Sequence, residues 1–270
     1  MRRNVRRAVL AAAASVVLAG LGYAANNLVF GGSVREVSGT PHTFRVQLGV
    51  DDAQVQLVTE GVRLAEAAFA DLLGTRIPQP VTVRLARRTP CIPFSRGNET
   101  AVADEDELCI NTDGPGWRFV SGREPDTALS IVAHELFHTL QGQLGCLPGP
   151  GAHRYAWWVE GSATYMGWRA AEHAGRVTGA DVAREMRSWG GWRPGLGRLE
   201  AYERGISGDP AYALAQRAVA QLVGRSGEAS LTDFCRRVGR GQAWRAAFRT
   251  SFGVSVPNFY RAFERGREAS

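Results

Sequence analysis

The stretch from Ile131 to Leu140 reads IVAHELFHTL and places two of the chain's five histidines, His134 and His138, four residues apart. Residues four apart stack on one face of an α-helix, so both imidazoles can reach one metal ion. Glu135 lies about 100 degrees around the helix from His134, close enough to reach a water beside that ion. Zinc lowers the pKa of a bound water to about 7, and a neighbouring carboxylate can take its proton. The spacing H-E-x-x-H therefore predicts a catalytic site with one Zn²⁺ ion.

A catalytic zinc needs a third protein ligand. The pattern H-E-x-x-H-x-x-G-x-x-H requires glycine and histidine where this chain has Gln141 and Leu144, so the three-histidine class is excluded. The segment WWVEGSATYM, 157–166, offers Glu160, which lies 22 residues beyond His138. A second helix can fold back antiparallel and present Glu160 as the third ligand, leaving one position open for water. The competing interpretation has no metal site: the first helix is amphipathic and contains two partly buried histidines, and Glu160 is a surface acid on the second helix.

The segments HELFH and WWVEGSATY resemble the gluzincins, a superfamily whose second zinc helix typically reads W-x-x-E-G-x-A-x-Y. The similarity is greatest to the compact, aminopeptidase-like branch, because the thermolysin-type branch usually has aspartate where this chain has Thr164. The resemblance implies a zinc metallopeptidase in which His134, His138 and Glu160 bind zinc and Glu135 is the general base and then the acid. The motif G-x-M-E-N, with which aminopeptidases of this class hold the substrate amine, is absent before His134.

The resemblance also implies a tyrosine that stabilises the oxyanion. GDPAYALAQRAVAQLV, 208–223, is similar to the helix that carries it, which assigns the role to Tyr212. A phenol can donate a hydrogen bond to charge that develops only in the transition state. Tyr165, Tyr202 and His153 are the alternatives, and a purely structural Tyr212 would pack at the interface between lobes.

Two more features of the segment 157–166 bear on packing. Within the resemblance, Gly161 and Ala163 would let the second helix pack closely against the first. Trp157 and Trp158 are expected in the core, because large aromatic side chains usually serve burial.

Hydrophobic periodicity predicts an α+β chain: a mixed first lobe, about 33–143, and a mainly helical second lobe, about 144–270, within one domain. Together with the resemblance, this pattern predicts a zincin-like bilobal domain with a small mixed sheet. The 107–112 strand, ELCINT, is expected at the sheet edge, where an extended peptide could pair with it. The helix that carries the histidines is expected to begin with Asp126 as its N-cap. The expected strands are 33–50, 81–86 and 107–112, and the expected helices are 51–73, 126–144, 156–175, 209–224, 228–239 and 257–268.

The first 32 residues have the pattern of a signal peptide or an N-terminal membrane anchor. Four arginines within residues 1–7 precede the apolar run AVLAAAASVVLAGLGYAA, 8–25. The run reaches the roughly 18 residues at which spanning a membrane becomes feasible. We therefore expect a secreted or extracytoplasmic protein, either released or anchored to the membrane; a soluble N-terminal helix is the third interpretation.

If the protein is exported, its four cysteines are expected to form two disulfides, because thiols pair and the bonds persist in an oxidising compartment. Three pairings are possible. We favour Cys91 with Cys109, which would close a loop between two strands, and Cys146 with Cys235. A Cys/His zinc cluster is the competing interpretation, but no C-x-x-C occurs.

Composition narrows the class of partner. With 44% apolar and 21% charged residues among 270, the chain can bury a substantial core. Its net charge of +6 comes from arginines that form no long basic run after residue 8, and no nucleic-acid-binding motif is present. We expect a peptide or protein substrate and no nucleic acid, and the oligomeric state stays open.

These observations predict an exported zinc metallopeptidase that hydrolyses peptide bonds by glutamate-assisted attack of a zinc-bound water. The alternative is a catalytically silent, gluzincin-like domain with a structural zinc, acting as a surface binding or scaffold protein.

Overall fold

The computed structural model describes residues 33–35, 37, 39–87, 91, 99–148, 154–191 and 196–268. The N-terminal segment 1–32 and His153 lie outside these ranges, so the expectations about them stay predictions. Within the described residues, no helix combines the length and apolar character needed to cross a membrane.

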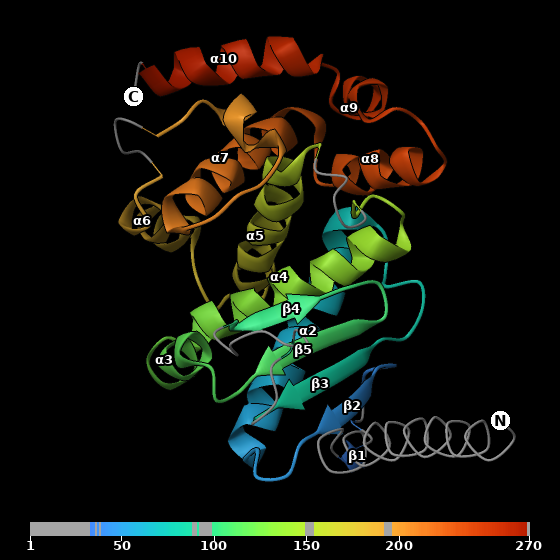
Figure 1. Cartoon of the computed structure of the whole chain (residues 1–270), viewed down its shortest axis with the longest axis vertical. Coiled ribbons are helices and arrows are strands. Elements are labelled where there is room, and N and C mark those ends of the chain that lie inside the picture. The colour runs from blue at the N-terminus through green and yellow to red at the C-terminus, as the bar shows by residue number, and fades with distance from the viewer. Residues whose placement is uncertain are drawn as a thin grey trace, which may run out of the picture.

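The described chain is a mixed α+β structure (Figure 1). Its strands are β1 Ser33–Arg35, β2 Thr43–Val46, β3 Thr82–Ala86, β4 Ala101–Ala103 and β5 Glu107–Asn111. Its helices are α2 Asp52–Leu73, α3 Pro115–Arg123, α4 Pro125–Gln143, α5 Ala156–His173, α6 Gly179–Ser188, η1 Leu199–Glu203, α7 Asp209–Ser226, α8 Ala229–Gly239, α9 Trp244–Phe252 and α10 Val256–Glu268.

The strands form one five-stranded sheet in the order β1-β2-β3-β5-β4. The inner strands β2, β3 and β5 are parallel, and β1 and β4 pair antiparallel at the two edges. The segment ELCINT therefore forms an interior strand, and the prediction that it is an edge strand is wrong. β5 pairs with β3 on one side and with β4 on the other. The free edge beside α4 belongs to β4, which packs against that helix.

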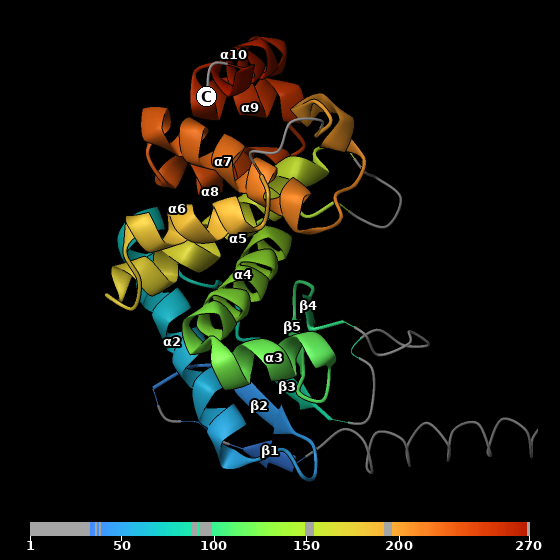
Figure 2. The same cartoon turned by 90° about the vertical axis from the view of Figure 1, so that its left-hand side faces the viewer.

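Helix α2 has the ends that its sequence predicts. The Asp51 side chain accepts a hydrogen bond from the Gln54 backbone N–H at 2.8 Å and caps the first turn. Gly74 ends the helix in the left-handed conformation, with φ of 62° and its N–H bonded to the Phe69 carbonyl. α2 and α4 lie on the same side of the sheet (Figure 2), so α2 supports the helix that carries both histidines.

Helix α4 begins two residues earlier than expected, with Glu124 rather than Asp126 at the N-cap. Pro125 occupies its first turn, where the missing N–H costs nothing, and Glu124 is the N-cap residue without a side-chain cap. Asp126 is therefore not the cap, and that prediction is wrong. Its carboxylate instead accepts a hydrogen bond from Arg176 Nε at 2.9 Å, which links the first turn of α4 to the segment that follows α5.

Helix α5 packs between α4 and α7, and glycines permit both close approaches. A Cβ added at Gly167 would lie 2.4 Å from the Ser130 carbonyl oxygen of α4. A Cβ at Gly161 would lie 2.7 Å from the backbone of Ala215 in α7. Gly161 thus permits the contact with α7, and the expectation that it faces the first histidine helix is wrong. The two glycines are six residues apart, which places them on different faces of α5.

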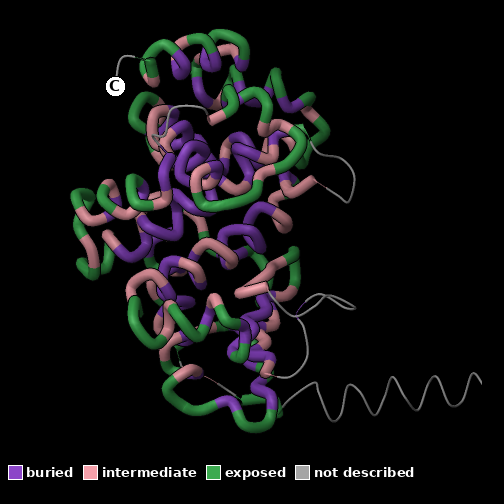
Figure 3. Tube along the Cα trace, turned by 60° about the vertical axis from the view of Figure 1, so that its left-hand side comes forward, coloured by how far each residue is buried: buried purple, intermediate pink, exposed green. Residues whose placement is uncertain are grey.

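Helices α7, α8, α9 and α10 form the end of the molecule farthest from the sheet, with α10 outermost (Figure 1). Buried segments continue from the sheet through the central helices (Figure 3). Trp157 and Trp158 have no exposed surface, as predicted for core residues. The proposed domain extent of 33–270, with lobes meeting near residue 143, stays a prediction.

Both favoured disulfides are present. Cys91 pairs with Cys109 of β5, and Cys146, just beyond α4, pairs with Cys235 of α8. The second bridge ties the end of the histidine helix to the helical part of the chain.

Candidate metal centre

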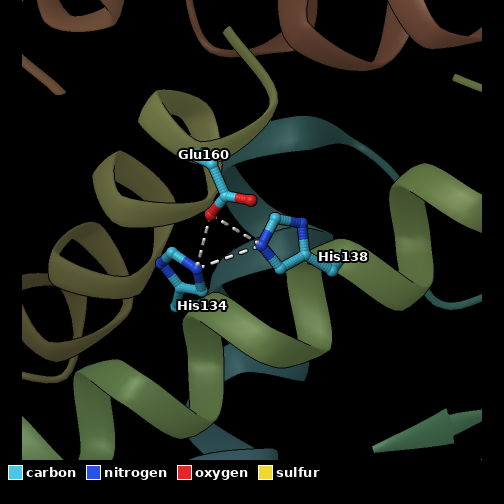
Figure 4. Close-up of side chains that lie close together, drawn as sticks. All are labelled: His134, His138 and Glu160. Carbon is cyan, nitrogen blue, oxygen red and sulfur yellow. Dashed lines mark hydrogen bonds and ion pairs between the residues drawn. The ribbon is translucent and has the colours of Figure 1, made fainter. Parts of the chain in front are cut away.

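Three side chains converge where α4 and α5 pack together. His134 and His138 lie on one face of α4, and Glu160 of α5 faces them (Figure 4). Their ligand atoms form a compact triangle: the two Nε2 atoms are 3.0 Å apart, and Glu160 Oε2 lies 3.5 Å from His134 Nε2 and 3.3 Å from His138 Nε2.

These distances fit tetrahedral zinc. Zinc bonds to imidazole nitrogen and carboxylate oxygen are about 2.0–2.2 Å long, so neighbouring ligand atoms of a tetrahedron lie about 3.3 Å apart. Two imidazoles and one carboxylate are also a donor set that zinc takes in sites with an open fourth position. The structure thus brings together the three residues that the sequence predicts as ligands, with atoms and spacing that suit the ion.

The outer nitrogens of both histidines have hydrogen-bonding partners. His138 Nδ1 lies 2.7 Å from Gln141 Oε1, and His134 Nδ1 lies 3.4 Å from Thr164 Oγ1. Such partners orient imidazole ligands and select the tautomer that leaves Nε2 available.

The charges of His138 and Glu160 are strongly coupled. Burial disfavours a charged His138, but the nearby Glu160 carboxylate outweighs it and raises the pKa of His138 to about 9. Burial also opposes an ionised Glu160, and the two histidines outweigh it, holding the pKa of that carboxyl far below its usual range. In the metal-free protein this pair is therefore an ion pair, and a metal ion has to displace its proton.

Glu135 lies next to the triangle on α4. Burial raises the pKa of its carboxyl, while His134 and His138 act in the opposite direction. A carboxylate whose pKa is moved toward neutrality is better suited to exchange protons near neutral pH.

Tyr212 of α7 lies beside the triangle of His134, His138 and Glu160. Its ring centroid is 6.3 Å from that of His134. Burial raises the pKa of Tyr212, and the carboxylates of Glu160 and Glu135 raise it further. The phenol therefore stays protonated and can donate a hydrogen bond at neutral pH.

The alternative tyrosines have other partners. The Tyr165 hydroxyl donates to Glu228 Oε1 at 3.3 Å, and burial raises the pKa of this phenol. Tyr202 lies in η1 and packs against the main core cluster. Of the three tyrosines considered, Tyr212 is the one whose ring contacts a histidine of the triangle.

Sequence reasoning missed the partners of both histidines. Thr164 was used only to separate two branches of the resemblance, and Gln141 only to exclude the three-histidine class. For Gln141 a signal was present. The signal was its position three residues after His138, which places both side chains on one face of the helix.

Comparisons with solved structures agree with this architecture. An M1 zinc metallopeptidase from Deinococcus radiodurans matches with 18% sequence identity and a TM-score of 0.53, covering 87% of this chain and 51% of that one. A mutant of it bound to a Tyr-Ser-Ala substrate matches with 19% identity over 86% of this chain, 50% of that chain, and a TM-score of 0.52. Legionella pneumophila aminopeptidase A in complex with aspartic acid matches with 15% identity, TM-score 0.52, covering 86% of this chain and 27% of that one.

The chain shares its fold with M1 zinc metallopeptidases. It spans about half the length of the Deinococcus proteins. No protein-family model matches its sequence, and no curated protein does.

Proposed function

We propose that this protein is a zinc metallopeptidase of the gluzincin type, with His134, His138 and Glu160 as the zinc ligands. The observation that carries the proposal is the 3.0–3.5 Å triangle of their ligand atoms, with Glu135 and Tyr212 beside it. When bound, zinc supplies Lewis-acid chemistry that acidifies a water and polarises a carbonyl group. The shared fold supports a peptide substrate for this site.

Two residues of the chain carry the proton and charge steps in this proposal. Glu135 accepts the proton of the attacking water and passes it to the amine that leaves. Its raised pKa suits this double role, since the carboxyl must gain and lose a proton in each turnover. Tyr212 donates a hydrogen bond to the negative charge that develops on the scissile carbonyl oxygen.

The substitution Glu135→Gln separates an enzyme from a silent domain. It keeps the shape of the side chain and removes the base, so turnover of a mixed peptide library should fall at least about 10²-fold while zinc content is retained. Glu124→Gln, an exposed change at the start of the same helix, is the matched control and should leave turnover unchanged. Equal turnover in wild type and Glu135→Gln would favour the silent, structural-zinc alternative.

Export completes the proposal. Two disulfides support it, because such bonds persist mainly in oxidising compartments. Recovery of the protein from a reducing cytosol, with all four thiols free, would contradict it.

A further inference from the structure

Gln141 is a buried polar residue whose amide is hydrogen-bonded on both sides beside the metal centre. Its side chain is fully buried between α4 and α5, although it lies within a stretch of α4 whose buried face is otherwise mostly apolar. Its amide nitrogen donates to the Val159 carbonyl at 3.1 Å and to Ser162 Oγ at 2.9 Å. Its amide oxygen lies 2.7 Å from His138 Nδ1.

These bonds determine which way the amide points. Ser162 Oγ donates its own hydrogen to the Trp158 carbonyl at 2.6 Å, so it can only accept from Gln141. The Val159 carbonyl is likewise an acceptor. Both contacts therefore require the NH₂ group of Gln141, and its oxygen must face His138. An oxygen at 2.7 Å can only accept a hydrogen, so Nδ1 of His138 carries one.

We propose that Gln141 is a positioning residue of the metal centre, which holds His138 in the Nδ1–H tautomer and directs its Nε2 lone pair toward the ion. This inference rests on the proposed zinc site. Anchored to α5 through Val159 and Ser162, the amide also couples the orientation of His138 to the helix that provides Glu160. The corresponding contact of His134, with Thr164 at 3.4 Å, is longer, so His138 is the more firmly held of the two.

Two substitutions of Gln141 test this role. Gln141→Met keeps the length of the side chain and removes the acceptor, so the zinc dissociation constant, measured by competition with a chromophoric chelator, should rise about 10–100-fold. Gln141→Glu keeps an acceptor for Nδ1–H but loses the amide N–H bonds to Val159 and Ser162, so its zinc affinity should lie between those of wild type and Gln141→Met. If Gln141 served only packing, Gln141→Met would bind zinc more tightly than Gln141→Glu, because glutamate adds a buried charge and methionine does not.

Gln143→Met is the matched control. This glutamine lies on the same helix and also makes three hydrogen bonds to other segments, with Gln79 N, Gln79 O and Glu105 O; within the described residues it makes none with a histidine. Its substitution should leave the zinc affinity unchanged.

Each outcome has a separate meaning. A wild-type chain that binds no zinc would contradict the proposed function and, with it, this inference. Zinc binding by wild type and an equal affinity of Gln141→Met would overturn this inference alone, as would Gln141→Glu binding as weakly as Gln141→Met. If Gln141→Met does not fold, ¹⁵N NMR of the zinc-loaded wild-type chain decides. The Nδ1 proton of His138 should exchange with solvent more slowly than that of His134, because its contact is 2.7 Å rather than 3.4 Å long, and equal exchange of the two protons would overturn the inference.

Discussion

The close packing of α5 on α4 provides the sharpest structural prediction, through Gly167→Ala. The new Cβ would lie 2.4 Å from the Ser130 carbonyl oxygen and 3.2 Å from His134 Cβ, whereas ordinary contacts begin at 3.4 Å. The helices therefore have to separate locally by about 1 Å. Zinc–ligand distances tolerate only about 0.2 Å of change, so Glu160 can no longer meet both histidines without strain.

The magnitude follows from two opposing effects. Overpacking typically costs about 1–3 kcal/mol, and replacing a glycine inside a helix by alanine returns about 0.5–1 kcal/mol. We expect the free energy of unfolding of the metal-free protein to fall by about 1–2 kcal/mol in urea titrations. The zinc affinity should fall by at least about tenfold, because a displacement of about 1 Å exceeds what the coordination geometry accepts.

Gly224→Ala is the control for the glycine itself. Gly224 lies in α7 and is exposed, and a Cβ added there would meet no neighbouring side chain or other segment within 4 Å among the described residues. This change should be neutral or stabilise the protein by up to about 1 kcal/mol and leave zinc binding unchanged. Equal stability and equal zinc affinity of Gly167→Ala and Gly224→Ala would refute the close contact between α4 and α5 as the cause of the expected losses.

Three further predictions concern the site and its supports. Tyr212→Phe should lower kcat for peptide cleavage about 10²–10³-fold without loss of zinc. The control Tyr165→Phe removes the bond to Glu228 and should leave kcat unchanged. Equal effects of the two changes on kcat would contradict the role of Tyr212. Replacing Cys146 and Cys235 by alanine should cost about 4–5 kcal/mol in denaturant titrations, more than the about 3 kcal/mol for Cys91 and Cys109, because the bridged residues are 89 rather than 18 apart; the reverse order would contradict this. In the chelated protein the Glu160 carboxylate raises the pKa of His138 to about 9, whereas its pKa in the unfolded chain is about 6.5. The ion pair of His138 and Glu160 therefore stabilises the fold fully below pH 6.5, and this stabilisation is lost as the pH rises through 9. The urea midpoint should fall over that interval, His138→Gln should abolish the trend, and a flat wild-type profile would contradict the ion pair.

Local signals predicted much of the fold. The acidic cap at Asp51 and the glycine at Gly74 identify the two ends of α2 within one residue. Helices α3, α6 and α9, the 3-10 helix η1 and strand β4 were missed, because they are short and their burial depends on neighbours distant in sequence. The single strand expected over 33–50 is two antiparallel strands, β1 and β2. Helix α6 carried a usable signal, the capping box of Thr178 and Asp181. The order of the strands could not be predicted from local pattern, which is why ELCINT was assigned to an edge.

The site was more predictable than the sheet, because metal ligands follow strict spacing. His134 and His138 follow from the helical repeat, and Glu160 from the need for a third ligand on a second helix. The proximity of Tyr212 to His134 depends on how α7 packs on α5, and only the resemblance pointed to it. The bonds of Gln141 to Val159 and Ser162 depend on how α5 packs on α4, so the sequence alone could not supply them, whereas its contact with His138 follows from their spacing within α4.

Metal-dependent peptide cleavage by the purified full-length chain tests the central claim most directly. Zinc content is measured first, and the zinc-loaded and chelated forms are then incubated with a mixed peptide library analysed by mass spectrometry. We predict one zinc ion per chain, cleavage by the loaded form, none after chelation, and recovery when zinc is restored. Full zinc occupancy without any metal-dependent cleavage would contradict the proposed peptidase.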